Sequence, residues 1–164
     1  MSVSSINGTR QYLTFQLGEE IFAIDVANVR EILEYTTVTR MPRAPEYMRG
    51  VINLRGSVVP VVDMREKFGM DRMEKTIDTC IVVVEVVSGD GNIVMGALVD
   101  SVQEVFELEA DQIEPAPKIG THLRTEFIAG MGKRDERFII ILDTSKVFSS
   151  DELAELTEAQ AVNE

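Results

Sequence analysis

The stretch Tyr47-Met48-Arg49-Gly50-Val51-Ile52-Asn53-Leu54-Arg55-Gly56-Ser57-Val58-Val59-Pro60-Val61-Val62-Asp63 decides the fold of this chain. Its two aliphatic, β-branched runs, 51–54 and 58–62, predict two strands joined by a glycine-containing turn. Pro60 has no backbone N–H, so we expect the second strand to lie at a sheet edge or to carry a bulge near this residue, with an edge open for a partner. Arg55 stands at the turn, where an always-charged guanidinium needs a carboxylate, carbonyl groups or water. It is therefore the first candidate binding residue.

The same patterns outside this stretch predict three more hairpins. They join 12–17 to 21–24, 79–87 to 93–99, and 126–132 to 137–142. The run 79–87 is almost continuously aliphatic, which indicates burial on both faces. One helical turn and then a strand are expected after Asp25, and a short helix over 64–68 that Asp63 caps and Gly69 ends. Short strands with little helix favour small barrels or a sandwich.

A weak internal repeat suggests two related halves. An aliphatic residue followed by aspartate ends four apolar runs, at Asp25, Asp63, Asp100 and Asp143. These carboxylates fit either a cluster for metal or phosphoryl chemistry or repeated capping at strand ends, and the pattern favours capping. We expect residues 1–9 to be disordered, residues 10–148 to form one domain of two barrel subdomains, and residues 149–164 to form an acidic C-terminal helix or tail that begins at a capping box.

Composition argues against several classes of partner. The net charge of −12 and a pI near 4.5 disfavour binding to nucleic acid or to an anionic membrane. No apolar run approaches the roughly 20 residues of a membrane span, and the first residues do not resemble a signal peptide. Cys80, the single cysteine, lies in an aliphatic run and is expected to be a buried thiol. These features indicate a cytoplasmic protein without membrane insertion. Residues 40–67 are locally basic, which fits either scattered charge or a patch for an acidic partner.

The sequence offers no catalytic constellation and no expected cofactor or metal. His122 is the single histidine and has no second imidazole or nearby cysteine as a metal partner. Gly130-Met131-Gly132 lacks the third glycine of a phosphate-binding turn. The absence of such a site points to recognition through strand edges and grooves. The alternative from another class is a small-ligand-binding β-barrel, which requires an internal pocket with convergent polar groups.

One long motif makes the chain recognisable. The sequence Arg49-Gly50-Val51-Ile52-Asn53-Leu54-Arg55-Gly56, followed by Val59-Pro60-Val61-Val62-Asp63-Met64-Arg65, resembles the CheW family of bacterial chemotaxis adaptors. Shorter matches occur at 22–26, 29–32, 96–102 and 113–117, so the resemblance covers about Tyr12 to Phe148. No kinase or receiver module accompanies it, which is expected of a free-standing adaptor rather than of CheA or CheV.

This resemblance implies a fold and a function. The fold is mainly β: two interlocked five-stranded SH3-like barrels on a shared core, with short helices and a C-terminal helix. The function is a non-enzymatic scaffold that couples the cytoplasmic tip of methyl-accepting chemoreceptors to the regulatory domain of the histidine kinase CheA, at membrane-associated arrays. An adaptor for pilus motility or another sensory array is the alternative within this class.

The resemblance also implies two binding surfaces. Arg55 and Glu31 correspond to a charge pair beside the receptor-binding groove of the family. The receptor-binding residues are then Val29, Glu31, Ile32, Arg55, Leu98 and Val99. The kinase-binding residues are Val38, Arg40 and Met41.

Overall fold

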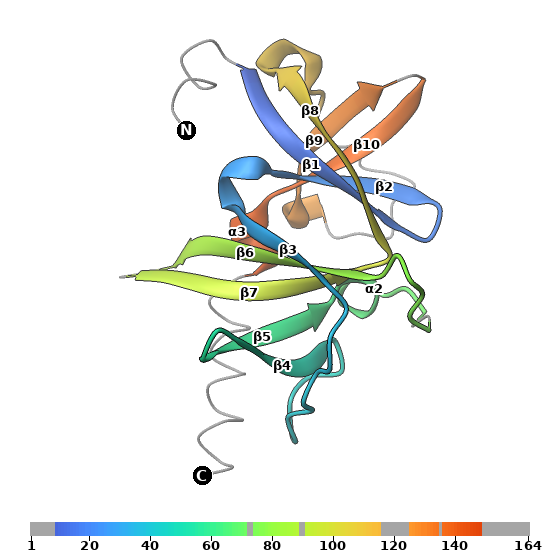
Figure 1. The fold of residues 1–164 in the computed structure, drawn as a ribbon. Coiled ribbons are helices and arrows are strands. Elements are labelled where there is room, and N and C mark those ends of the chain that lie inside the picture. Colours follow the sequence, from blue (N-terminus) through green and yellow to red (C-terminus); the bar gives the residue numbers. More distant parts are fainter. Residues whose placement is uncertain (1–8, 72–73, 89–90, 116–124, 135, 149–164) are drawn as a thin grey trace.

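We analysed a computed structural model, which describes residues 9–71, 74–88, 91–115, 125–134 and 136–148 (Figure 1). The strands are β1 (Thr9–Leu17), β2 (Glu20–Asp25), β3 (Val29–Glu34), β4 (Met48–Leu54), β5 (Ser57–Asp63), β6 (Cys80–Ser88), β7 (Gly91–Val99), β8 (Ser101–Glu109), β9 (Ile128–Arg134) and β10 (Arg137–Leu142). The short helices are η1 (Val26–Asn28), α2 (Met64–Lys67), η2 (Ala110–Gln112), η3 (Thr125–Phe127) and α3 (Thr144–Val147).

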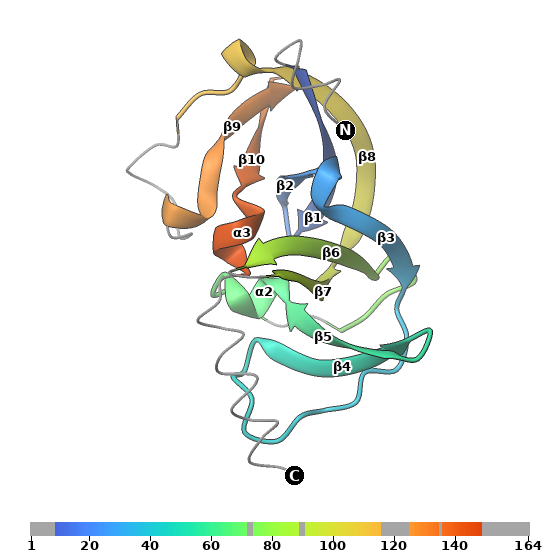
Figure 2. The same cartoon turned by 90° about the vertical axis from the view of Figure 1, so that its left-hand side faces the viewer.

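The strands form two five-stranded sheets, each curled into an open barrel. Barrel A has the strand order β8-β1-β2-β10-β9, and barrel B has the order β3-β6-β7-β5-β4. The chain crosses from barrel A to barrel B between β2 and β3 and returns between β7 and β8, so the two barrels are interlocked (Figure 2). All four predicted hairpins are present. The predicted fold class is therefore confirmed, whereas the predicted C-terminal helix and the N-terminal segment 1–8 lie outside the described residues.

Both barrels follow one construction plan. Each contains a parallel strand pair, β10–β2 in barrel A and β5–β7 in barrel B, and a short helix after its second hairpin strand. Each also has a segment that bridges to the far edge strand, through Glu114 to Met131 and through Thr39 to Val51. A glycine permits each close approach: a Cβ would lie 2.4 Å from Ile113 at Gly130 and 2.0 Å from the Thr39 carbonyl oxygen at Gly50. In this comparison β8 of barrel A is the counterpart of β3 of barrel B.

Three hydrophobic clusters hold the barrels together, one inside each barrel and a larger one between them. Strand β6 serves two of them, because alternate side chains point to opposite faces. Val82 and Val84 face the core between the barrels, whereas Ile81 and Val83 face the interior of barrel B. All four are fully buried, which confirms the predicted burial of this strand on both faces. Apolar side chains therefore occupy both barrel interiors.

The expectation that Pro60 places its strand at a sheet edge is wrong. Strand β5 lies between β7 and β4, and β4 is the edge strand. Val51, which lies opposite Pro60, exchanges both of its backbone hydrogen bonds with Thr39 at 2.8 Å and therefore needs none from Pro60. On the other side of β5, pairing with β7 begins only at Val61. The alternative expectation, a bulge carried by the second strand, is also wrong: the β4–β5 register shifts between Met48 and Gly50, so the extra residue lies on β4.

Capping explains three of the four repeated aspartates. The side chains of Asp25, Asp63 and Asp143 accept hydrogen bonds from the first turns of η1, α2 and α3. Asp100 differs, because it precedes β8 directly and has other partners.

Cys80 is half-buried rather than fully buried as expected; its Sγ lies 3.1 Å from the Asp78 carbonyl oxygen, and burial raises the pKa of the thiol.

Candidate partner-binding surfaces

The turn between β4 and β5 presents Arg55 to solvent. Arg55 and Gly56 both have positive φ, 51° and 89°, which is the geometry of a two-residue hairpin turn whose twist matches the strands. Asn53 supports the turn, since its Oδ1 accepts a hydrogen bond of 2.8 Å from the Gly56 N–H. The predicted three-residue turn is thus two residues long, and Ser57 begins β5.

Arg55 forms the predicted charge pair with Glu31 across the opening of barrel B. Its two terminal nitrogens contact the two carboxylate oxygens of Glu31, in the fork geometry that guanidinium and carboxylate groups favour. Glu31 lies on β3 and Arg55 on the β4–β5 hairpin, so the pair joins opposite ends of the sheet. The hydrogen bond from Arg55 lowers the pKa of Glu31. Because the Arg55 side chain is 70% exposed, a partner can compete for this pair.

The apolar residues predicted around this pair fall into two groups. Ile32 is 44% exposed on β3, and Val29 is half-buried at the margin of the shared core. Leu98 and Val99 are adjacent on β7 and point to opposite faces, into the interior of barrel B and into the shared core. Only 8% and 2% of their surfaces are exposed. Since adjacent strand residues point to opposite faces, the expectation that both side chains face a groove with Ile32 is corrected.

The loop between β3 and β4 forms a hollow of about 430 Å³. Its walls include all three residues predicted to contact the kinase, Val38, Arg40 and Met41, together with Tyr35, Ala44, Pro45, Glu46, Met48 and Arg49. The Thr39–Val51 bridge bends the chain so that these side chains converge. Arg49 is held by Asp63 at 2.9 Å. Arg40 is exposed and has no ion pair with any residue that the structure describes, which leaves its charge available to a partner.

Three of the six cations in the locally basic segment bind within the protein: Arg49 to Asp63, Arg55 to Glu31 and Arg65 to Asp100. These cations therefore do not form one basic patch across the segment. Lys67 lies over the rings of Tyr47 and Phe127, at 4.6 and 5.1 Å from their centroids, and Arg40 and Arg43 are exposed in the loop.

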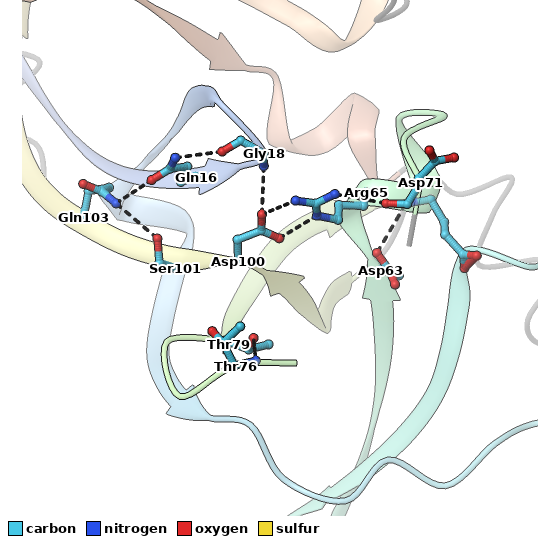
Figure 3. A network of polar contacts seen from close by, with 11 residues as sticks. Gln16, Gly18, Asp63, Arg65, Asp71, Thr76, Thr79, Asp100, Ser101 and Gln103 are labelled. Atoms are coloured by element: carbon cyan, nitrogen blue, oxygen red, sulfur yellow. Dashed lines mark hydrogen bonds and ion pairs between the residues drawn. The ribbon is translucent and has the colours of Figure 1, made fainter. Parts of the chain in front are cut away.

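Sequence reasoning missed the polar contact at the second crossing between the barrels. Figure 3 shows Asp100 between the turn of barrel A and helix α2 of barrel B. Its carboxylate accepts hydrogen bonds from the Gly18 N–H at 2.8 Å and from Arg65 at 2.7 and 2.5 Å. Burial opposes ionisation of Asp100, but the hydrogen bonds from Arg65 and Gly18 outweigh it and lower the pKa of the carboxyl group. Arg65 belongs to the recognisable motif, yet no local pattern links it to a residue 35 positions away.

The described residues offer little for catalysis or membrane insertion. Within these ranges no three His, Cys, Asp or Glu side chains are placed to hold a metal ion, and His122 lies outside them. No helix in the described part of the chain is long and apolar enough to cross a bilayer.

Two interlocked barrels with filled interiors, an exposed charged turn and a loop-lined hollow define a protein-interaction module. Residues 11–152 match the CheW-like domain, and the chain belongs to that family. It is 39% identical over 145 residues to the chemotaxis protein CheW of Klebsiella aerogenes, covering 88% of this chain and 85% of that protein. It is 30% identical to CheW of Treponema pallidum, covering 89% and 86%. The crystal structure of the scaffolding protein TtCheW from Thermoanaerobacter tengcongensis superposes with a TM-score of 0.77 at 34% identity, covering 85% of this chain and 88% of that one.

Proposed function

We propose that this protein is a non-enzymatic adaptor that couples the cytoplasmic tips of methyl-accepting chemoreceptors to the regulatory domain of the kinase CheA. Membership of the CheW-like family supports the class of function. The observation that carries the proposal is the separation of two accessible features on barrel B. The Glu31–Arg55 pair lies at the β4–β5 turn, whereas the hollow around Arg40 lies in the β3–β4 loop.

The receptor surface in this proposal centres on Glu31, Arg55 and Ile32. Glu31 and Ile32 are adjacent on β3 and point to opposite faces, but β3 is an edge strand, so a receptor tip that lies along this edge can reach the exposed pair on one face and Ile32 on the other. Val29 supports this surface from the margin of the shared core. Leu98 and Val99 act from beneath, by fixing the position of the sheet on which β3 lies. In this proposal Leu98 and Val99 therefore maintain the shape of the receptor surface and do not contact the receptor.

The kinase surface in this proposal is the hollow that includes Val38, Arg40 and Met41. It combines apolar walls with an exposed cation, which suits a domain surface that presents an apolar side chain beside a carboxylate. The protein acts in the cytoplasm and joins membrane arrays through the receptor. A pilus-motility or other sensory array would use the same surfaces. A ligand-binding barrel is disfavoured because apolar side chains fill both barrel interiors.

Titration of a soluble receptor-tip fragment and of the isolated kinase regulatory domain against the purified protein tests this proposal. We expect Arg55→Glu to weaken binding of the receptor fragment and to leave kinase-domain binding within a few-fold. Met41→Asp is expected to do the reverse, since residues without shared partners act independently. Equal losses for both partners from either substitution would show that the two surfaces are not separate.

A further inference from the structure

Strand β8 is a nine-residue edge strand of barrel A. It pairs with β1 on one side, and no described residue pairs with its other side. The other edge of barrel A differs, because Glu114 bridges to Met131 on β9. Since backbone groups alternate in direction along a strand and those of Glu104 bond to Thr14 on β1, Val105 and Glu107 point their N–H and C=O away from β1, whereas the N–H of Glu109 donates to Gln112 Oε1 at 2.7 Å. The outer edge of β8 can therefore accept another strand, and Figure 2 shows it on the outside of the molecule.

This edge carries a concentrated negative charge. Residues 101–114 contain five acidic residues and no lysine or arginine. All five are exposed: Glu104, Glu107 and Glu109 on β8, and Asp111 and Glu114 in the segment that leads from β8 to the bridge on β9. Within the described residues, Glu107 and Asp111 form no ion pair. In the middle of β8, Val105 is 52% exposed between these charges.

The contrast with barrel B shows that this charge is not a requirement of the fold. Strand β3 is the counterpart of β8, and its Glu31 is held by Arg55 from the far hairpin. On β8 the nearest described partner of Glu107 is Gln11, a neutral side chain at 3.4 Å. The counterpart strand β3 thus carries a carboxylate that is paired within barrel B, whereas Glu107 on β8 has no ion pair with any described residue.

Two copies of this chain are poor occupants of the edge. Two β8 strands side by side would bring like charges together, which is destabilising. The exposed cations Arg40 and Arg43 of a second copy lie beside Pro42 and Pro45, which cannot donate to a strand ladder. The carboxylates therefore disfavour the pairing of two β8 strands while leaving the backbone of this edge open to a strand of opposite charge.

We propose that the outer edge of β8 binds an extended, basic segment of a partner protein, which adds a strand to barrel A. Val105, Glu107 and Glu109 alternate with the buried Phe106 and Leu108, so they share the outer face of the strand. An antiparallel partner that matches them carries lysine or arginine at two alternate positions and an apolar residue at the next. The edge of β8 thus recognises the partner strand through backbone hydrogen bonds and through attraction between its carboxylates and the basic side chains of the partner.

A blocked peptide, Lys-Thr-Lys-Thr-Val, probes this edge directly in the full-length protein. We expect saturable binding that weakens as salt rises, with slower amide hydrogen exchange at alternate residues of β8. Methylating the backbone nitrogens on one edge of the peptide abolishes binding, and methylating those on the other edge does not, because only one edge pairs. This comparison uses the unaltered protein, so folding of a variant does not affect its outcome.

A pair of charge-matched variants completes the test. Glu107→Arg with Glu109→Gln changes the edge, whereas Glu19→Arg with Glu20→Gln makes the same change of charge at the β1–β2 turn and the first residue of β2. The edge variant is expected to bind about tenfold more weakly or worse, and the turn variant to bind normally. Equal losses in both variants, equal binding of the two methylated peptides, or exchange protection outside β8 would show that the peptide responds only to net charge and would overturn the proposal.

Discussion

Replacing Asp100 by asparagine removes one charge of the pair at the second crossing between the barrels. The side chains of Arg65 and Asp100 are only 14% and 16% exposed, so the guanidinium loses its counter-charge in a largely dry site. Breaking a buried pair costs about 3–5 kcal/mol. Arg65 keeps its hydrogen bond to the Asp71 carbonyl oxygen at 3.1 Å, and the asparagine oxygen still accepts one donor, so we expect about 2–4 kcal/mol.

Urea denaturation at pH 7 measures this loss. With a slope of about 2 kcal/mol/M, the midpoint falls by about 1–2 M and the slope stays unchanged. Asp25→Asn is the matched control, because Asp25 ends the strand before the first crossing and pairs with Arg10, which is 58% exposed. Its expected cost is at most about 1 kcal/mol, since asparagine also caps η1. Equal midpoints for the two variants would refute the reasoning.

The pH dependence follows from the lowered pKa of Asp100. A carboxyl group whose pKa is lower in the folded state stabilises the fold above its unfolded pKa, near 3.9, and loses that effect as the pH falls through its folded pKa. The difference in unfolding free energy between the native protein and Asp100→Asn is therefore constant from about pH 5 to 8 and shrinks below about pH 4. A difference that grows on acidification would contradict this assignment.

Three further substitutions test other parts of the account. Arg55→Glu is expected to abolish receptor coupling with little change in the unfolding midpoint, and the reversed pair Glu31→Arg with Arg55→Glu to restore part of the binding measured by titration. Met41→Asp should weaken binding of the kinase regulatory domain while the receptor-fragment affinity stays constant, because the hollow is remote from the β4–β5 turn. Gly50→Ala should destabilise the protein by about 2–4 kcal/mol in the same urea assay, because a Cβ there meets the Thr39 carbonyl oxygen and φ is +145°.

Local patterns in the sequence were sufficient to predict most of the elements. Alternation of apolar residues predicted the hairpins, and aspartates at strand ends predicted the starts of η1 and α2. The prediction that Pro60 lies on an edge strand was wrong. It rested on the backbone hydrogen bond that proline cannot donate to a neighbouring strand, and the hydrogen bonds between Thr39 and Val51 remove the need for that bond. The relevant contact comes from a separate segment of chain, which a window around Pro60 does not contain.

The candidate site was predictable only where the family motif identifies residues. The Glu31–Arg55 contact joins residues 24 positions apart, and the resemblance, rather than periodicity, connected them. Leu98 and Val99 were expected in a groove because both are apolar, but strand geometry sends their side chains to opposite faces. Asp100 matched the other aspartates in sequence, and only the fold distinguishes its partners from theirs.

The most direct test of the adaptor function is kinase activity in a reconstituted mixture of receptor in membranes, the kinase CheA and this protein. We predict that CheA autophosphorylation changes far more with all three components than with any two, and that either Arg55→Glu or Met41→Asp removes the effect. Full coupling by both variants, or ATP turnover by this protein alone, would contradict it.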